Sequence, residues 1–446
     1  MSRFIEEFEA YCATYGPPER LELMLCDLNA VLRGKWLPGN EAEKLAKGAV
    51  RLPLSTYAPN ILGEEVEATG LGIVVGDPDG KIVPVPGSLR NVPWARGHVA
   101  QVQVEMQDES GGISPLSPRQ KLQDVVDRFK ANGLRPVVAT ELEFYILRPR
   151  KTAEEAPQPP EGVPNAQNYD LKVLENSEEI LTEILAASKT QGLATDTLIA
   201  EYGPGQFEVN FLHTDDPVLA ADTALLFRRL VKGVVRKHGM EATFMAKPYA
   251  ACPGNGMHVH ASVLDQDGLN IFSAEHGVSE TLRAAVGGVL ATMREMQAIF
   301  APHMNSYRRF QPNSFAPTAP DWGLDNRSAS VRLPETRGPG ARLEHRIAGA
   351  DVNPYLALTA VLGGMLHGIE TRPDVPLPLE DPAMIAAAPL GHDWRQAVDL
   401  FAASEFAAEL FGEDYRRIYS TVRYDEIDQL TRIISPTEYR YYLGRL

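Results

Sequence analysis

The sequence predicts an α+β fold with two parts, a small N-terminal domain over residues 1–108 and a larger domain over residues 109–446. Short segments with strand character dominate the first part, whereas helices interleave with polar-faced strands in the second. Residues 107–118 lie between the two parts and are rich in turn-forming residues, so they are expected to form a linker. This distribution of strands and helices favours the α+β class.

The N-terminal part begins with a predicted helix over residues 2–15, because its apolar residues recur on one side. Strands are expected at residues 21–27, 71–75, 81–85 and 98–106. The last of these alternates cleanly between polar and apolar residues, which is typical of a strand with one buried face. Residues 77–80 read Asp-Pro-Asp-Gly and are expected to join two strands as a turn.

The larger part begins with a helix from the Ser117-Pro118 start signal to about Ala131. Residues 150–168 are rich in proline and poor in apolar side chains, so they are expected to form an exposed loop. Further helices are predicted near residues 175–191, 215–238, 278–300 and 353–369.

The overall charge restricts the possible partners. The chain carries 59 Asp and Glu residues against 43 Lys and Arg residues, which gives a formal net charge of −16. An acidic surface repels nucleic acids and anionic lipids, so neither is an expected partner, and an anionic ligand would require a local basic pocket. Three scattered cysteines, an N-terminus without signal-peptide character and the lack of a long apolar run predict a cytoplasmic location.

Four predicted strands each carry polar or charged residues on one face at a spacing of two. The opposite face of each strand is largely apolar. A polar strand face is usually just solvated, but the coincidence of four such strands predicts that the polar faces line one shared cavity. The residues on these faces are Glu141 and Glu143, Glu208 and Asn210 with Glu201 across a turn, His258, His260 and Ser262, and Arg342, Glu344 and Arg346.

Five glutamates and one or two histidines in one cavity would repel one another unless cations lay among them. Carboxylate-rich sites with an occasional imidazole suit Mg²⁺ or Mn²⁺. Zinc would require Cys and His ligands at other spacings, and no HExxH motif occurs.

A cluster of arginines follows in the sequence, namely Arg309, Arg327, Arg332, Arg342 and Arg346. Arginines on a surface commonly pair with acidic neighbours, yet planar guanidinium groups also suit carboxylate and phosphate oxygens. Metals held by glutamates and facing arginines are what phosphoryl transfer needs. No Walker A motif is present, and the glycines at 254 and 256 are typical of a tight turn.

Together these residues resemble the glutamine synthetase superfamily over nearly the whole chain. Six motifs occur in the family's order: Glu141-Leu-Glu143-Phe, Glu201 with Gly205-Gln206-Phe-Glu208, Gly256-Met-His258-Val-His260, Asn305-Ser-Tyr-Arg-Arg309, Asn326-Arg327-Ser-Ala-Ser-Val-Arg332 and Arg342-Leu-Glu344-His-Arg346. The resemblance implies a β-grasp N-terminal domain and a catalytic domain with a curved antiparallel sheet flanked by helices. It also implies a homododecamer of two stacked hexameric rings, with active sites between subunits.

The resemblance further implies roles for individual residues in a reaction of ATP, L-glutamate and an amine through a γ-glutamyl phosphate. One metal is expected on Glu143, Glu201 and Glu208, and another, on the ATP phosphates, is expected on Glu141, His258 and Glu344. Glutamate is expected to contact Arg309, Arg346 and the backbone of Gly254. The transferring phosphoryl group is expected to contact Arg327 and Arg332, and the nucleotide His260, Ser262, Arg332 and Arg342.

Two departures from the family pattern concern the amine site. Phe315 stands where glutamine synthetases carry a flap glutamate that binds and deprotonates ammonium. Residues 54–57 read Leu-Ser-Thr-Tyr, without the aspartate that the family's N-terminal domain usually offers to the neighbouring subunit's ammonium site. A phenyl ring cannot accept a proton, but it packs on alkyl groups and attracts amines. Trp322 is expected to act likewise.

These departures resemble the γ-glutamylpolyamine synthetase group, whose members ligate putrescine and similar amines to glutamate. Four alternatives remain at this stage: a glutamine synthetase that uses ammonia, a γ-glutamyl-monoamide synthetase, a non-catalytic ring that kept the fold, and a guanidino kinase. The complete set of metal ligands argues against the non-catalytic ring. Glutamate dependence separates the ligases from a kinase.

Overall fold

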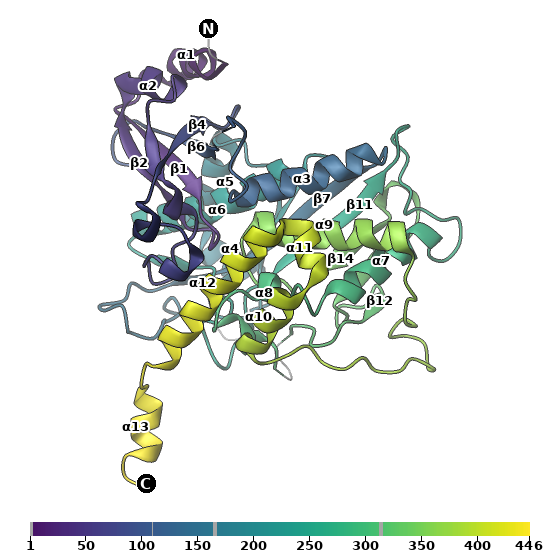
Figure 1. Ribbon diagram of the computed structural model, residues 1–446. Helices are drawn as coiled ribbons and strands as arrows, with labels where there is room; N and C mark the ends of the chain where they lie inside the picture. Colours follow the sequence, from purple (N-terminus) through teal and green to yellow (C-terminus); the bar gives the residue numbers. More distant parts are fainter. Residues whose placement is uncertain (1–2, 109, 164–166, 312–314) are drawn as a thin grey trace.

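The structure is a computed structural model that describes residues 3–108, 110–163, 167–311 and 315–446. Its described strands form two sheets, one in the N-terminal part of the chain and one in the remainder. Helices α1 (Arg3–Tyr15) and α2 (Ala42–Ala46) lie beside the first sheet, and most of the other helices pack around the second (Figure 1). The fold is therefore α+β, as the sequence predicts.

The N-terminal sheet has the strand order β2-β1-β6-β4-β3, with β5 paired to β6. The central strands β1 and β6 run parallel and their other neighbours are antiparallel, which agrees with the expected β-grasp arrangement. The strands are β1 (Arg20–Cys26), β2 (Leu32–Pro38), β3 (Arg51–Pro53), β4 (Asp79–Pro84), β5 (Arg90–Asn91) and β6 (Val99–Gln107). Helices α1 (Arg3–Tyr15) and α2 (Ala42–Ala46) accompany them.

The alternating strand β6 is buried on both faces, not on one alone. Its polar side chains contact the second part of the chain. Gln101 accepts a hydrogen bond from Arg229 at 2.9 Å, and Gln103 donates to Asp222 at 3.1 Å and to Tyr355 at 3.0 Å. The polar face of this strand is therefore an interface between the two parts and is not solvated.

The predicted strand at residues 71–75 is wrong. Ile73–Val75 form a single 3₁₀ turn whose side chains are 74%, 57% and 56% exposed. Gly72 and Gly76 bracket the turn with φ of 86° and 82°, left-handed values that end strand geometry. Residues 77–80 consequently do not join two strands, and β4 already begins at Asp79.

The second sheet has the order β12-β13-β14-β11-β7-β9-β8, with β10 paired to β7. All its pairs are antiparallel except β12 with β13. Its strands are β7 (Arg135–Leu147), β8 (Thr195–Ala200), β9 (Gln206–Phe211), β10 (Glu241–Thr243), β11 (Met257–Leu264), β12 (Trp322–Leu324), β13 (Val331–Glu335) and β14 (Arg342–His345).

The predicted helices of the larger part are confirmed, some in two pieces. They are α3 (Pro118–Ala131), α4 (Leu171–Asn176), α5 (Glu178–Thr190), α6 (Pro217–Lys237), α7 (Glu280–Thr292), α8 (Gln297–Phe300) and α9 (Pro354–Thr371). Ser117 caps α3 by accepting a hydrogen bond from the amide of Gln120, as its start signal implies. None of the helices that the structure describes is long and apolar enough to cross a membrane.

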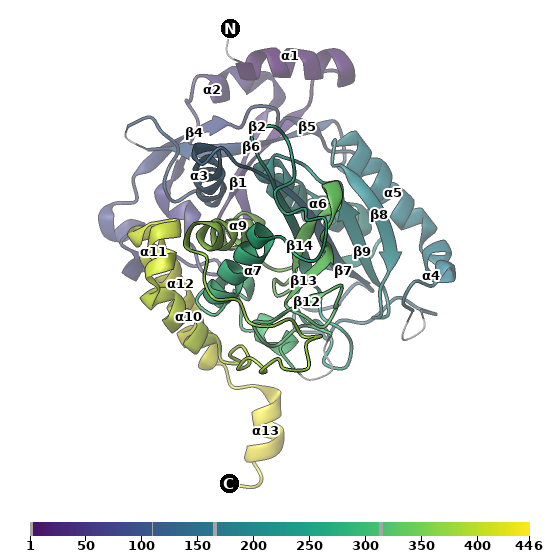
Figure 2. The ribbon, with the colours of Figure 1, turned by 90° about the vertical axis from the view of Figure 1, so that its right-hand side faces the viewer.

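A set of C-terminal helices was not predicted from the sequence. They are α10 (Trp394–Ala403), α11 (Glu405–Phe411), α12 (Glu413–Thr431) and α13 (Pro436–Tyr442). Figure 2 shows α10 to α12 packed beside the body of the molecule, whereas α13 projects away from it. Arg423 of α12 is fully buried and contacts the Asn29 side chain, so these helices also bind the N-terminal part.

Candidate active site

Four neighbouring strands of the second sheet hold the predicted site residues on one face. The register places Glu143 opposite Glu208, Glu141 opposite His258, and His260 opposite Glu344. Side chains that are directly opposite on antiparallel strands lie close together on the same face. The sheet therefore gathers residues that lie more than two hundred positions apart in the sequence.

The shared cavity predicted from these polar faces is present. It has a volume of about 880 Å³. Leu142, Val209, Val259 and Leu343 on the opposite faces are fully buried, so burial of the apolar faces fixes which side chains point into the cavity. Its lining includes the predicted residues Glu141, Glu143, Glu201, Glu208, Gly254, His258, His260, Arg309, Phe315, Arg327, Arg332, Arg342, Glu344 and Arg346.

Two predicted site residues do not line the cavity. Trp322 is only 2% exposed, and its indole N–H donates to the carbonyl of Pro376 at 2.8 Å, because the ring packs into the main hydrophobic core. Ser262 lies on the expected face of β11 but further along the strand, opposite Val137, and is buried there. The expected roles of Trp322 and Ser262 therefore stay predictions.

Glu141 is the centre of the first charged cluster. Its carboxylate lies 3.0 Å from Nδ1 of His258 and 2.9 Å from Nε2 of His260. Burial raises the pKa of Glu141, but these hydrogen bonds outweigh burial and hold the pKa well below its usual range. Burial and the nearby Arg346 lower the pKa of His258, which keeps its imidazole neutral, as metal ligation requires.

A second group of carboxylates lies beside the first. Burial, followed by the negative charge of Glu201, raises the pKa of Glu143 to about 7. Burial and the charges of Glu141, Glu143 and Glu201 raise the pKa of Glu208 in the same way. Like charges held together in a buried site favour protonation or a bound cation.

The ligand atoms of two sets of residues approach within 4.8 Å of one another, which fits a metal ion. The sets are Glu141, Glu208 and His258, and Glu141, His260 and Glu344. Their oxygen-rich donors suit a hard divalent cation. Neither group reproduces an expected ligand set. Glu141 belongs to both groups, His260 takes the place of His258 beside Glu344, and Glu143 and Glu201 belong to neither group.

Arginines contact the carboxylate and histidine cluster from the same sheet and from the segments beside it. Arg332 donates to Glu344 at 2.9 Å and to Asp325 at 3.0 Å, and Arg346 also contacts Glu344. Arg342 donates to Nδ1 of His260 at 3.1 Å, and Arg309 donates to the carbonyl of Ile347 at 2.8 Å. This arrangement presents cationic groups toward any anionic substrate that enters the cavity.

The backbone at Gly254 closely approaches other parts of the site. A Cβ atom there would lie 2.4 Å from the carbonyl oxygen of Ala246 and 2.7 Å from Cγ of Arg309, so only glycine fits. The Gly254 carbonyl accepts a hydrogen bond from Gln206 at 2.9 Å. These contacts hold the backbone at the edge of the cavity.

An aromatic cluster borders the cavity at the place expected for the amine. Phe315 is 68% exposed, and its ring stacks on Tyr202 with centroids 5.0 Å apart. Tyr169, whose hydroxyl accepts a hydrogen bond from Arg327 at 3.5 Å, also lines the cavity. Sequence reasoning missed both tyrosines, since neither lies in a recognisable motif. Residues 312–314 of the flap are outside the described residues.

The comparisons with known proteins show the family of this chain. The model of the glutamine synthetase catalytic domain matches residues 115–442. Gamma-glutamylputrescine synthetase PuuA of Escherichia coli (strain K12) is 37% identical, over 99% of this chain and 95% of that protein. Glutamate–isopropylamine ligase of a Pseudomonas species is 33% identical, over 95% of both chains. The chain therefore belongs to the glutamine synthetase family, whose ligases use ATP and divalent metals.

Two further matches extend the comparison. Gamma-glutamylethanolamide synthetase GlnA4 of Streptomyces coelicolor is 34% identical, over 81% of this chain and 78% of that protein. The solved structure of a GmaS–ADP complex matches with a TM-score of 0.85 at 25% identity, over 98% of this chain and 99% of that one. The fold is thus shared along nearly the whole length.

Proposed function

We propose that this protein is an ATP-dependent ligase that joins the γ-carboxylate of L-glutamate to an organic amine, with a polyamine such as putrescine as the favoured substrate. One observation carries the proposal: a complete set of carboxylates and arginines surrounds a cavity whose border bears Phe315 and Tyr202. An aromatic border suits the methylene groups and the cationic head of an amine. Three relatives whose names include γ-glutamylputrescine, γ-glutamylethanolamide or isopropylamine support the ligation of glutamate to an organic amine.

The proposed roles are those that the resemblance to the family implies. Glu143, Glu201 and Glu208 would hold one divalent cation, and Glu141, His258 and Glu344 would hold another. Mg²⁺ or Mn²⁺ held in this way would supply positive charge for the ATP phosphates and for glutamate binding. Arg309 and Arg346 bind the glutamate carboxylates together with the backbone of Gly254.

Arg327 and Arg332 stabilise the phosphoryl group as it passes to the glutamate γ-carboxylate, while His260 and Arg342 contact the nucleotide. The amine then attacks the γ-glutamyl phosphate carbonyl and displaces phosphate. Guanidinium groups suit both steps, since negative charge accumulates on the phosphate oxygens in each.

We also propose a cytoplasmic homododecamer of two stacked hexameric rings, with the domain boundary near residue 108. Leu54–Tyr57, the segment that the resemblance places at a neighbouring subunit's amine site, form a short 3₁₀ helix. The free cysteines Cys12, Cys26 and Cys252 suit a reducing compartment. Sedimentation of the purified full chain tests the assembly.

The decisive experiment is phosphate release from ATP and glutamate with a panel of amines, combined with product masses. The panel contains ammonia, methylamine, ethylamine, ethanolamine, putrescine, cadaverine and spermidine. We expect the highest kcat/KM with a diamine and a product of γ-glutamyl-diamine mass. A preference for ammonia contradicts the proposal, and activity with monoamines alone rejects the polyamine assignment while keeping the ligase chemistry.

Replacing Phe315 by alanine should weaken amine use selectively. Loss of one aromatic contact is expected to raise the KM for putrescine by about three- to ten-fold, whereas the KM values for glutamate and ATP stay unchanged. Steady-state kinetics with each substrate varied in turn measure this. Tyr439→Ala, a change at an exposed aromatic residue on the projecting α13, is the control. An equal rise in the KM for glutamate would show that Phe315 shapes the whole cavity.

A further inference from the structure

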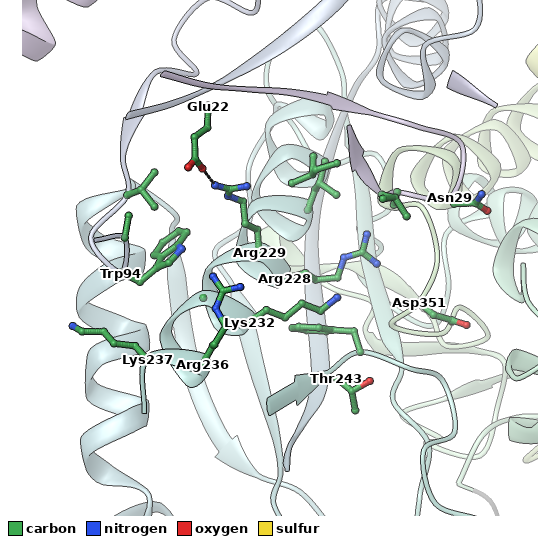
Figure 3. A pocket seen from close by; sticks show the side chains of 18 of the residues that line it. Glu22, Asn29, Trp94, Arg228, Arg229, Lys232, Arg236, Lys237, Thr243 and Asp351 are labelled. Carbon is green, nitrogen blue, oxygen red and sulfur yellow. Dashed lines mark hydrogen bonds and ion pairs between the residues drawn. The ribbon is translucent and has the colours of Figure 1, made fainter. Parts of the chain in front are cut away.

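A second cavity lies between the N-terminal sheet and helix α6, with a volume of about 1160 Å³ (Figure 3). It shares no lining residue with the candidate active site. Strands β1 and β2 and the segment around Trp94 form one wall, and α6 forms the opposite wall. Nothing in the proposed reaction uses this space.

One face of α6 makes the cavity basic. Arg228, Lys232 and Arg236 lie four residues apart and therefore point to the same side of the helix. Arg20 and Arg96 add positive charge from the other wall. The chain as a whole is acidic, with a net charge of −16, so a cavity whose charged lining is mainly basic is unusual for this protein.

Little negative charge in the cavity balances these groups. Glu22 and Asp351 are the acidic residues in its described lining. Glu22 is already paired with both Arg20 and Arg229. One Asp351 oxygen accepts a hydrogen bond from Ser306 at 2.6 Å, and Asp351 is the carboxylate that faces Arg228.

Arg228 is nine-tenths buried and incompletely bonded. Its Nη1 donates to the carbonyls of Ala350 at 2.9 Å and Val352 at 2.8 Å, but its Nη2 has no partner. Lys232 and Arg236 have no carboxylate partner among the residues that the structure describes. Lys232 and Arg236 are exposed, whereas Arg228 is buried. Cations gathered in this way are stabilised by an anion.

We propose that this cavity binds a small molecule that carries phosphate groups. A phosphate offers several anionic oxygens in different directions, so a molecule with more than one phosphate group suits the row of cations that Arg228, Lys232 and Arg236 form along α6. A single carboxylate would need only one guanidinium. Trp94 and Phe244 add aromatic surface to the same cavity, and Trp94 packs directly on Gly233 of α6, so an organic phosphate has apolar walls for its remaining part.

The test uses the full chain and pyrophosphate as the probe, in buffer that contains a chelator so that no metal binds the probe. Calorimetry and tryptophan fluorescence follow binding, since Trp94 lines the cavity. Lys232→Gln combined with Arg236→Gln is expected to raise the dissociation constant by about ten-fold or more. Arg332→Ala, in the active-site cavity, is expected to leave this binding in place.

The matched control is Lys189→Gln combined with Arg283→Gln, which removes one lysine and one arginine from the exposed faces of α5 and α7. This control should bind pyrophosphate like the unmodified chain. A second measurement does not depend on affinity: pyrophosphate should raise the melting temperature of the unmodified chain but not that of the Lys232 and Arg236 double variant.

Three outcomes would overturn the proposal: no pyrophosphate binding by the unmodified chain, equal binding by the double variant, or loss of all binding in Arg332→Ala. Citrate serves as the polycarboxylate arm. If citrate binds in a manner that depends on Lys232 and Arg236 while pyrophosphate does not, the cavity binds anions but the assignment to phosphate is wrong.

Discussion

Replacing Glu344 by glutamine is expected to reduce ligase turnover by about a hundred- to a thousand-fold. The side chain is 1% exposed and faces His258, Arg332 and Arg346 at the centre of the site. An amide has nearly the same shape, but it carries no charge to hold a cation or to balance the two arginines. Phosphate release under saturating substrates measures the loss.

The control for this variant is Glu335→Gln on the neighbouring strand β13, where the carboxylate is exposed. Circular dichroism should show that both variants fold. Turnover of Glu344→Gln within a factor of about two of the unmodified enzyme would sink its assignment as a metal ligand. It would also favour a non-catalytic role for the whole cluster.

Divalent cations are expected to stabilise the fold strongly, and more so as pH rises. A cation at a hundred times its dissociation constant contributes about 2.7 kcal/mol. Melting temperatures with Mg²⁺, with Mn²⁺ and with a chelator, recorded at about pH 6 and about pH 8, test this expectation.

The sign follows from the raised pKa values of the carboxyl groups. Glu143 moves from 4.5 to about 7 because it is buried beside Glu201, so the metal-free fold holds a proton that the unfolded chain has released. Its contribution to stability is present below pH 4.5 and is lost as pH rises through about 7. A bound cation needs the ionised carboxylate, so the gain from metal grows over the same interval.

Glu208→Gln provides the matched control, since it removes one buried charge from the same group. Without metal this variant should melt above the unmodified chain at the higher pH, and it should respond less to added cation. Equal stabilisation by metal at both pH values would contradict the account of like-charge repulsion.

The sequence predicted which face of each strand carries the site residues, because the apolar face of a strand must pack against the core and the polar face then points the other way. Glu141 and Glu143 had to point away from Leu142. The order of the strands was not predictable from periodicity, since β14 lies beside β11 only through long-range pairing. The resemblance to the family implied a curved antiparallel sheet, and the order of its strands came from the structure.

The errors have equally local causes. An apolar run such as Ile73–Val75 looks like a strand until its flanking glycines adopt left-handed angles. Ser262 lies on the expected face of β11, opposite Val137, and its contact with the nucleotide stays a prediction. Trp322 sits at the start of the edge strand β12, and only the packing of the core decides which way its ring turns.

The basic face of α6 illustrates a different limit. Charges four residues apart on a helix usually mark a solvated surface. Here the N-terminal sheet forms the other wall of the cavity that these basic residues line, and no local sequence pattern predicts this arrangement. The burial of the polar face of β6 was not predicted for the same reason, since its hydrogen-bond partners on α6 and α9 are remote in the sequence.

The register of the four site strands restricts which sequence changes such an enzyme can accept during evolution. One extra residue before Glu141 in β7 would turn Leu142 and Phe144 into the cavity and both carboxylates into the core. Insertions within these strands are therefore lethal to the chemistry, whereas Tyr202 and Phe315 lie on connecting segments that tolerate exchange. Substitutions at Tyr202 and Phe315 could therefore change the amine that is used, whereas changes to the register of the site strands would abolish the reaction.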